Sequence, residues 1–170
     1  MSVAVIIHER HGLWSTQLRL RLRHRPVRWF ETRGRAELQS AVKGLAHPVV
    51  LIDLARDPLE GLGDLDELFQ GSPAALVLLL NPQGDHEVAD LARELGATHV
   101  CSGFVPPPEV ARLIDRWIAL AAEKSDHAGW SRPLETDALS EFLESLDPSL
   151  GIPHSPRPTF RRPRPRGNPT

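Results

Sequence analysis

The chain has 170 residues, of which 41% are hydrophobic and 25% charged, as in a soluble globular domain with additional segments. Its single cysteine, Cys101, excludes a disulfide framework within the chain and favours a reducing compartment. The longest apolar run, residues 74–80, is far shorter than the ~20 residues that span a membrane, and the short apolar N-terminus is no signal peptide. We therefore expect a cytoplasmic protein, with a net charge of −2.

The N-terminal segment begins the pattern that the rest of the domain repeats. Residues 3–7 form a continuous run rich in β-branched side chains, which predicts a strand buried on both faces. A helix to about residue 24 follows, with Ser15 or Thr16 as its expected N-cap. Leucines and arginines also alternate over residues 18–23 at the spacing of a strand, but the position between two clearer strands favours the helix.

The same alternation continues along the chain. Further strands are predicted at residues 27–31, 49–52, 75–80 and 98–102, and helices at residues 35–46, 64–70, 87–95 and 106–123. Residues 54–63 contain Pro58 and two glycines and are expected to be a loop. Asp85 is the expected N-cap of the fourth helix, and Gly96 is expected to end that helix.

Five strands alternating with five helices predict an α/β fold over residues 1–124. Buried strands joined by helices favour a doubly wound, five-stranded parallel sheet with helices on both faces, a flavodoxin-like three-layer sandwich. Ligands of such sheets bind at the carboxyl ends of the strands, so candidate site residues are sought there.

The composition changes after residue 124. Residues 125–147 are expected to form a polar linker and a short acidic amphipathic helix, and residues 148–170, rich in proline and arginine, a disordered tail. Eight arginines and a single acid fall within residues 10–36, whereas acids dominate residues 123–147. This segregation suggests that the acidic segment docks on its own domain or on a partner, although solvated helix faces would give the same pattern.

Three short motifs follow one another along the chain. Residues 49–54 read Val-Val-Leu-Ile-Asp-Leu and are followed by Pro58 and by Gly-Leu at 61–62. Residues 95–100 read Leu-Gly-Ala-Thr-His-Val, and residues 104–110 read Phe-Val-Pro-Pro-Pro-Glu-Val. In this order the motifs resemble the phosphoacceptor strand and loop, the turn into the fifth strand and the approach to the last helix of the receiver (CheY-like) domain of response regulators. The resemblance covers about 120 residues.

The resemblance also implies a site. In this family an aspartate after the third strand accepts a phosphoryl group, acids after the first strand hold Mg²⁺, and a Ser or Thr and a Lys contact the phosphate. Asp53 matches the phosphoacceptor position, and Asp53 and Glu9 match two of the expected metal ligands. Asn81 stands at the Ser/Thr switch position, and Ser102 or Gly103 at the lysine position.

Several of these positions depart from the family pattern. His8 stands where a second acid is expected, and a histidine is a poor Mg²⁺ ligand. No lysine lies between Lys43 and Lys124, so we expect no neighbouring cation to replace the missing lysine. Each lost electrostatic stabiliser costs roughly 10²–10³ in rate. We therefore favour the interpretation in which Asp53 accepts no phosphoryl group and only caps its own loop.

The sequence thus favours a pseudo-receiver, a signalling module that binds a protein partner without phosphorylation, without a cofactor and without enzymatic activity. One alternative is a Mg²⁺-dependent phosphoacceptor of a two-component phosphorelay that uses Asp53. Another is a nucleic-acid-associated protein that uses its arginine-rich face and tail.

Two remaining residue types are assigned no function. A transition-metal site of His8, His11 and His99 is conceivable, but scattered histidines are more often incidental. Cys101 is expected to be a small buried hydrophobic side chain within a strand.

Overall fold

The structure of the protein, a computed structural model, describes residues 2–128, with side chains described as far as residue 125. The strands are Ala4–His8 (β1), Arg28–Thr32 (β2), Val49–Asp53 (β3), Leu76–Asn81 (β4) and His99–Ser102 (β5). The helices are Leu13–Arg21 (α1), Arg35–Val42 (α2), Pro58–Gly71 (α3), His86–Glu94 (α4) and Pro107–Ala128 (α5). The predicted alternation of strand and helix is confirmed.

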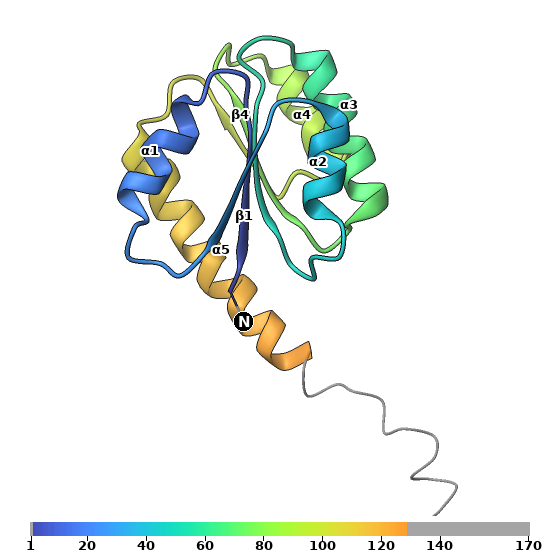
Figure 1. Cartoon of the computed structure of the whole chain (residues 1–170). Coiled ribbons are helices and arrows are strands. Elements are labelled where there is room, and N and C mark those ends of the chain that lie inside the picture. The colour runs from blue at the N-terminus through green and yellow to red at the C-terminus, as the bar shows by residue number, and fades with distance from the viewer. Residues whose placement is uncertain (1, 129–170) are drawn as a thin grey trace, which may run out of the picture. The chain divides into compact units, whose positions relative to one another are not determined.

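The five strands form one parallel sheet in the order β2-β1-β3-β4-β5. Helices α1 and α5 cover one face, and α2, α3 and α4 cover the other, which gives the predicted three-layer sandwich (Figure 1). The order in which strands are added reverses between β1 and β3, because β2 lies on one side of β1 and β3 on the other. The carboxyl ends of β1 and β3 therefore mark the edge at which such folds place their sites.

Each face of the sheet contributes to its own core. In β3, Val49 and Leu51 pack in the core under α1 and α5, while Val50 and Ile52 pack in the core under α2, α3 and α4. All four side chains have no exposed surface, and burial of each contributes roughly 1.5–3 kcal/mol. Two covered faces explain why the strands appear in the sequence as continuous apolar runs rather than alternating ones.

Helix α1 is confirmed, but its predicted cap is wrong. The helix begins at Leu13, with Gly12 at the N-cap in a left-handed conformation (φ 72°) and no side-chain cap from that residue. Ser15 and Thr16 lie inside the first turn, where both hydroxyl groups donate to the carbonyl of Gly12. The strand-like alternation has no structural counterpart, because Leu18 is fully buried against the sheet at helical spacing.

The segment after β3 corrects the prediction of a long loop. Helix α3 starts at Pro58, because proline suits the first helical position and the Asp57 carboxylate accepts a hydrogen bond from the Glu60 amide at 3.0 Å. Gly61 lies within the helix, where its missing side chain lets α3 approach the buried Leu54. The glycine marks a close approach between a helix and the chain beneath it, and does not break the helix.

The other boundaries differ by less. Helix α2 ends at Val42, earlier than predicted, and α5 continues to Ala128, past the predicted domain boundary. Asp85 is confirmed as the N-cap of α4, since its carboxylate accepts from the amide of Glu87 at 2.9 Å. Gly96 follows α4 with φ 101°, as predicted for a residue that ends a helix.

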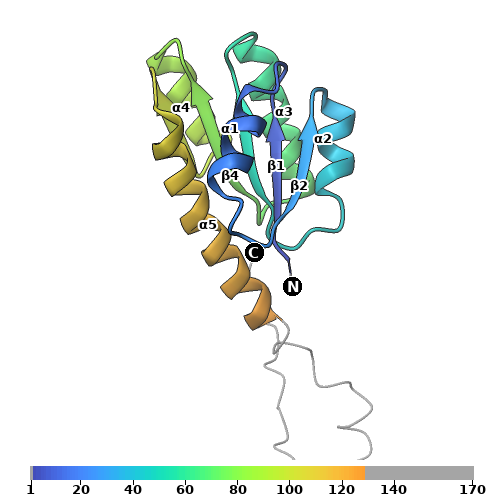
Figure 2. The ribbon, with the colours of Figure 1, turned by 60° about the vertical axis from the view of Figure 1, so that its left-hand side comes forward.

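Figure 2 shows α5 running along the sheet and past the amino ends of the strands. On the side of this helix that faces the sheet, Val110, Ile114 and Trp117 are buried, whereas Leu120 is 40% exposed. No helix within residues 2–128 is long and apolar enough to cross a membrane. The predicted acidic helix, its docking and the predicted tail lie outside the described residues.

The close approach at Gly61 generates a stability prediction. A Cβ atom at this position would lie 2.2 Å from Cδ2 of Leu54, which has no free space to move into because it is fully buried. We expect Gly61→Ala to lower the free energy of unfolding by about 1–3 kcal/mol, measured by urea denaturation. Gly34→Ala is the matched control, because a Cβ there meets nothing within 4 Å. A loss at Gly34 equal to that at Gly61 would contradict this account.

Candidate functional site

The predicted site residues meet at the carboxyl edge of the sheet. Asp53 pairs with Leu80 in the strand register, Asn81 pairs with Ser102, and Glu9 directly follows β1. A polar hollow at this edge is lined by His8, Glu9, Arg10, Arg33, Asp53, Arg56, Asp57, Glu60, Gly61 and Asp64. The edge therefore brings Glu9 and Asp53 to one hollow, as the sequence predicts.

Glu9 caps helix α1. Its side chain is buried, and its two carboxylate oxygens accept hydrogen bonds from the amides of Trp14, at 2.9 Å, and Ser15, at 2.6 Å. The carboxylate thus does the work that the N-cap residue, Gly12, cannot do without a side chain, and it meets the positive end of the helix dipole. Both oxygens of the predicted metal ligand are engaged in holding the fold together.

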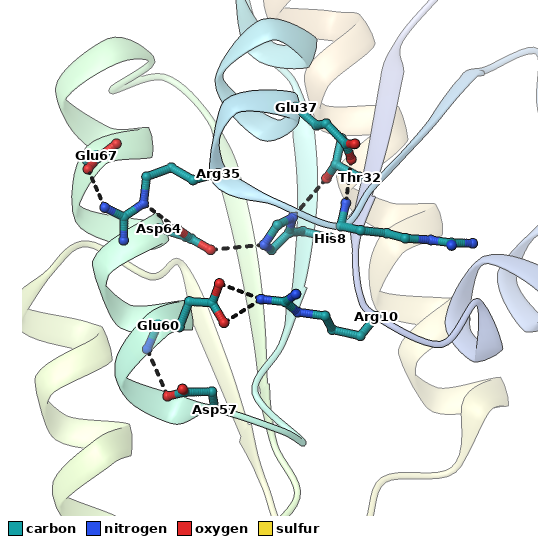
Figure 3. Close-up of polar contacts among 10 residues, drawn as sticks. His8, Arg10, Thr32, Arg35, Glu37, Asp57, Glu60, Asp64 and Glu67 are labelled. Carbon is teal, nitrogen blue, oxygen red and sulfur yellow. Dashed lines mark hydrogen bonds and ion pairs between the residues drawn. The ribbon is translucent and has the colours of Figure 1, made fainter.

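His8 occupies the place of the missing acid and is bonded at both ring nitrogens. Its Nδ1 lies 2.9 Å from Oγ1 of Thr32, and its Nε2 lies 3.0 Å from Oδ2 of Asp64 (Figure 3). A carboxylate only accepts hydrogen bonds, so the proton between the ring and Asp64 is carried by Nε2. All three side chains are buried, which makes this contact part of the core rather than an open ligand site.

Asp64 continues this chain of contacts to the surface. Its Oδ1 accepts from Nε of Arg35 at 2.7 Å, and Nη1 of the same guanidinium donates to Glu67 at 2.7 Å (Figure 3). The Arg35 side chain is half-exposed, so the buried carboxylate is paired with a cation that remains hydrated. The contacts join β1, β2, α2 and α3.

An ion pair crosses the hollow above this buried chain. Arg10, in the segment after β1, donates to both carboxylate oxygens of Glu60 in the first turn of α3 (Figure 3). Arg10, Glu60 and Asp64 are not among the residues that the sequence predicts for the site. One signal in the sequence could have indicated that Asp64 is buried: it lies on the same apolar side of the helix as Leu65 and Leu68.

Asp53 is half-buried and bonded to its own loop. Its Oδ1 accepts a hydrogen bond from the amide of Ala55 at 3.1 Å, which is the local contact expected of a residue that caps its own loop. Burial is the main cause that raises the pKa of Asp53 above its ordinary value. The negative charge of Glu9 raises it further, whereas the Ala55 amide and His11 oppose the shift.

The switch position is tied to its surroundings. Asn81 is fully buried, and its Nδ2 donates to the carbonyl of Asp85 at 2.7 Å, while its Oδ1 has no hydrogen-bond partner within the described residues. Its backbone carbonyl accepts from the amides of Gly84 and Gly103, which joins the loops after β4 and β5. The Asn81 side chain therefore contributes its amide group to the β4–α4 loop.

The expected lack of a neighbouring cation is wrong in one respect. Arg33 and Arg56 line the same hollow as Asp53 and, within residues 2–125, form no ion pair with a carboxylate. They reach the hollow from the β2–α2 and β3–α3 connections, which only the tertiary structure brings together. No signal at the predicted lysine positions could have revealed them.

No metal-binding cluster of three or more His, Cys, Asp or Glu side chains occurs in the part of the chain that the structure describes. The conceivable site of three histidines is therefore not assembled there. The sequence predicts Cys101 to be a small buried hydrophobic side chain. It packs against the core but is only partly buried, and burial raises the pKa of its thiol.

Comparison with known proteins identifies the fold. No protein-family model matches the chain, and no curated protein matches it in sequence. A CheY-like response regulator receiver domain protein from Methanospirillum hungatei aligns with a TM-score of 0.62 at 12% identity, over 73% of this chain and 99% of its own. A response regulator from Thermotoga maritima gives 0.60 at 11% identity, over 70% and 99%.

The receiver domain of the TMAO respiratory system response regulator TorR is also similar, with a TM-score of 0.59 at 15% identity over 70% of this chain and 98% of that one. At these identities the likeness concerns the fold. The predicted receiver-like architecture is thus confirmed, and the chemistry has to be argued from the residues of this chain.

Arg35 binds a buried carboxylate, Asp64, and an exposed one, Glu67, and we expect their removal to lower the free energy of unfolding by unequal amounts. Asp64→Ala leaves His8 without its partner in the core and removes the carboxylate that Arg35 binds. We expect a loss of about 2–4 kcal/mol in the free energy of unfolding, measured by urea denaturation at pH 7. Glu67→Ala removes the other, exposed partner of Arg35 and should cost less than about 1 kcal/mol. Equal losses in the two variants would show that burial does not matter here.

The raised pKa of Asp53 predicts that its charge destabilises the fold. The folded protein favours the neutral carboxyl, so the wild type loses stability as the pH rises above the unfolded value of about 3.9. We expect Asp53→Asn to be more stable than the wild type at pH 7 and to lose this advantage below about pH 4, measured by urea denaturation across pH. Asp90→Asn, at an exposed helical position, should show no such divergence. A destabilised Asp53→Asn at pH 7 would contradict the prediction.

Proposed function

We propose that this domain is a receiver-like signalling module that acts by binding another protein and does not depend on phosphorylation of Asp53. The observation that carries the proposal is the state of the two positions at the carboxyl end of β1, His8 and Glu9. Glu9 caps α1 with both oxygens, and both ring nitrogens of His8 are bonded within the core. The side chains that would assemble a Mg²⁺ site are occupied in stabilising the fold.

The consequence for phosphoryl transfer is large. A bound Mg²⁺ would supply charge neutralisation to the transferring group, and Glu9 and Asp53 are the residues that would hold it. Withdrawing Glu9 from the two amides would uncap α1, at a cost of about 1–2 kcal/mol. The missing lysine removes a further stabiliser, and each such loss slows the reaction by roughly 10²–10³.

Asn81 supports the same conclusion. A hydroxyl at this position, which the resemblance to receivers implies, would be small enough to turn toward a phosphate. The longer amide of Asn81 instead donates to Asp85, whose own carboxylate caps α4. Movement of Asn81 would break this hydrogen bond between its buried side chain and the carbonyl of Asp85.

In this proposal the protein is a binding module and not an enzyme, and it works in the cytoplasm. Two features support this assignment. The fold is that of response-regulator receivers, and the composition favours a reducing compartment. The partner would be a signalling protein, as the resemblance implies.

A second candidate is a working phosphoacceptor with an altered site. It is favoured by one observation, the presence of Arg33 and Arg56 in the hollow beside Asp53. Guanidinium groups bind phosphate oxygens well, so these arginines would take over part of the role of the missing lysine. The two candidates differ in whether Asp53 forms an acyl phosphate.

The test is incubation of the full chain with acetyl phosphate and Mg²⁺, followed by intact mass measurement. We expect no addition of about 80 Da, because Glu9 is engaged in capping α1, His8 stands in place of the second acid and the lysine is missing. A receiver with the full set of residues, treated in parallel, controls for reagent activity. An addition that appears in the wild type and vanishes in Asp53→Asn would overturn the proposal in favour of the phosphoacceptor.

A further inference from the structure

Helices α1 and α5 lie side by side on one face of the sheet (Figures 1 and 2), and a groove runs between the end of α1 and the first half of α5. The groove lies away from the hollow at Asp53 and shares no residue with it. The lining residues that matter here are Arg21, Leu22, Pro108, Ala111, Arg112 and Arg116.

Three arginines of this groove are poorly compensated. Within residues 2–125, Arg21 and Arg116 form no ion pair, and Arg112 approaches only Glu109, at 3.9 Å between two exposed side chains. Arg21 instead donates to the carbonyl and the side chain of Gln17 one turn earlier, which holds its guanidinium along α1. Cations therefore stand on both walls of the groove.

The acid of the groove does not offset these cations. Asp115 is bound by Arg25, whose Nε and Nη2 donate to its two oxygens at 2.6 and 2.9 Å. His24 adds a second contact at 3.4 Å. The hydrogen bond from Arg25 holds the pKa of Asp115 below its usual range, so the carboxylate stays ionised and paired. The pair fastens the end of α1 to α5 and leaves the net charge of the groove positive.

The floor of the groove is apolar. Leu22 and Ala111 are 2% and 5% exposed, and Pro108 continues this surface toward the start of α5. Residues 108–116 of α5 span about 12 Å at 1.5 Å per residue, which matches roughly two turns of a docked helix. A phosphate backbone would use the arginines but not this floor, whereas an amphipathic peptide uses both.

We propose that the α1–α5 groove binds an acidic amphipathic helix of a partner protein, with its apolar side on Leu22, Pro108 and Ala111 and its carboxylates on Arg21, Arg112 and Arg116. This rests on the proposed function, because it names the chemistry of the partner that the domain recognises. The arginines set the orientation of the helix, and the apolar floor provides the contact that excludes water.

The test is binding of a fluorescent synthetic peptide to the full chain, followed by fluorescence anisotropy at low and moderate salt. In the peptide, leucines recur at every third or fourth position and glutamates fill the opposite face. We expect saturable binding to the wild type that weakens at least about tenfold in the double variant Arg112→Gln, Arg116→Gln. Both positions are exposed on α5, so the variant should keep the wild-type urea midpoint.

The matched control is Lys43→Gln with Arg93→Gln, which removes the same charge from exposed positions outside the groove and should bind like the wild type. A peptide of equal composition but scrambled order should bind at least about tenfold more weakly than the ordered one. The proposal is overturned by no peptide binding, by equal losses in the two double variants, or by equal binding of the scrambled peptide. It is also overturned if duplex DNA binds more tightly with the same dependence on Arg112 and Arg116.

The two proposals fail separately. Acyl-phosphate formation at Asp53 would overturn phosphorylation independence and leave peptide binding in the groove intact. Failure of peptide binding in a chain whose Asp53 stays unlabelled would overturn the groove alone.

Discussion

The buried contact between His8 and Asp64 is the interaction on which the carboxyl edge of this domain depends. It joins the end of β1 to the middle of α3, and Thr32 and Arg35 extend it to β2 and α2. A buried carboxylate is tolerated only where it is hydrogen-bonded and its charge is matched. Here the His8 ring contributes a hydrogen bond, and the half-exposed guanidinium of Arg35 contributes the matching charge. Four elements of the fold are thus held by polar groups at the place where related folds keep an open site.

Because of these contacts, the side chains at this edge cannot bind a metal ion without giving up interactions that stabilise the fold. An open metal site needs carboxylates that face a ligand, whereas Glu9 faces the amides of α1 and His8 faces the core. Asp53 retains its position but lies half-buried beside another acid, which raises its pKa. The polar groups of this edge hold the loops together.

The binding surface lies elsewhere, on the face covered by α1 and α5. The bidentate pair of Arg25 and Asp115 fixes these helices against each other, and the apolar core beneath them holds Leu22 and Ala111 in place. Because the pair consumes the only acid that lines the groove, the remaining arginines are available to a partner.

The sequence by itself determined the order of the elements, the parallel sheet and the position of Asp53. Continuous apolar runs report strands covered on both faces, and local cap residues such as Asp85 and Gly96 report helix ends, because these signals depend on neighbours in the chain. The sequence suggested a loop at residues 54–63, because a glycine that permits close packing, Gly61, has the same local signature as one that breaks a helix.

Only the tertiary structure decided what the site residues touch. His8 and Asp64 are far apart in the chain, and so are Arg10 and Glu60, so no local pattern could pair them. The cap of α1 likewise comes from Glu9, outside the helix, and could not be told from a metal ligand by its position alone. The sequence shows a glutamate at position 9 whether its carboxylate binds a metal ion or two backbone amides. The packing of α1 against the sheet decides between these two roles.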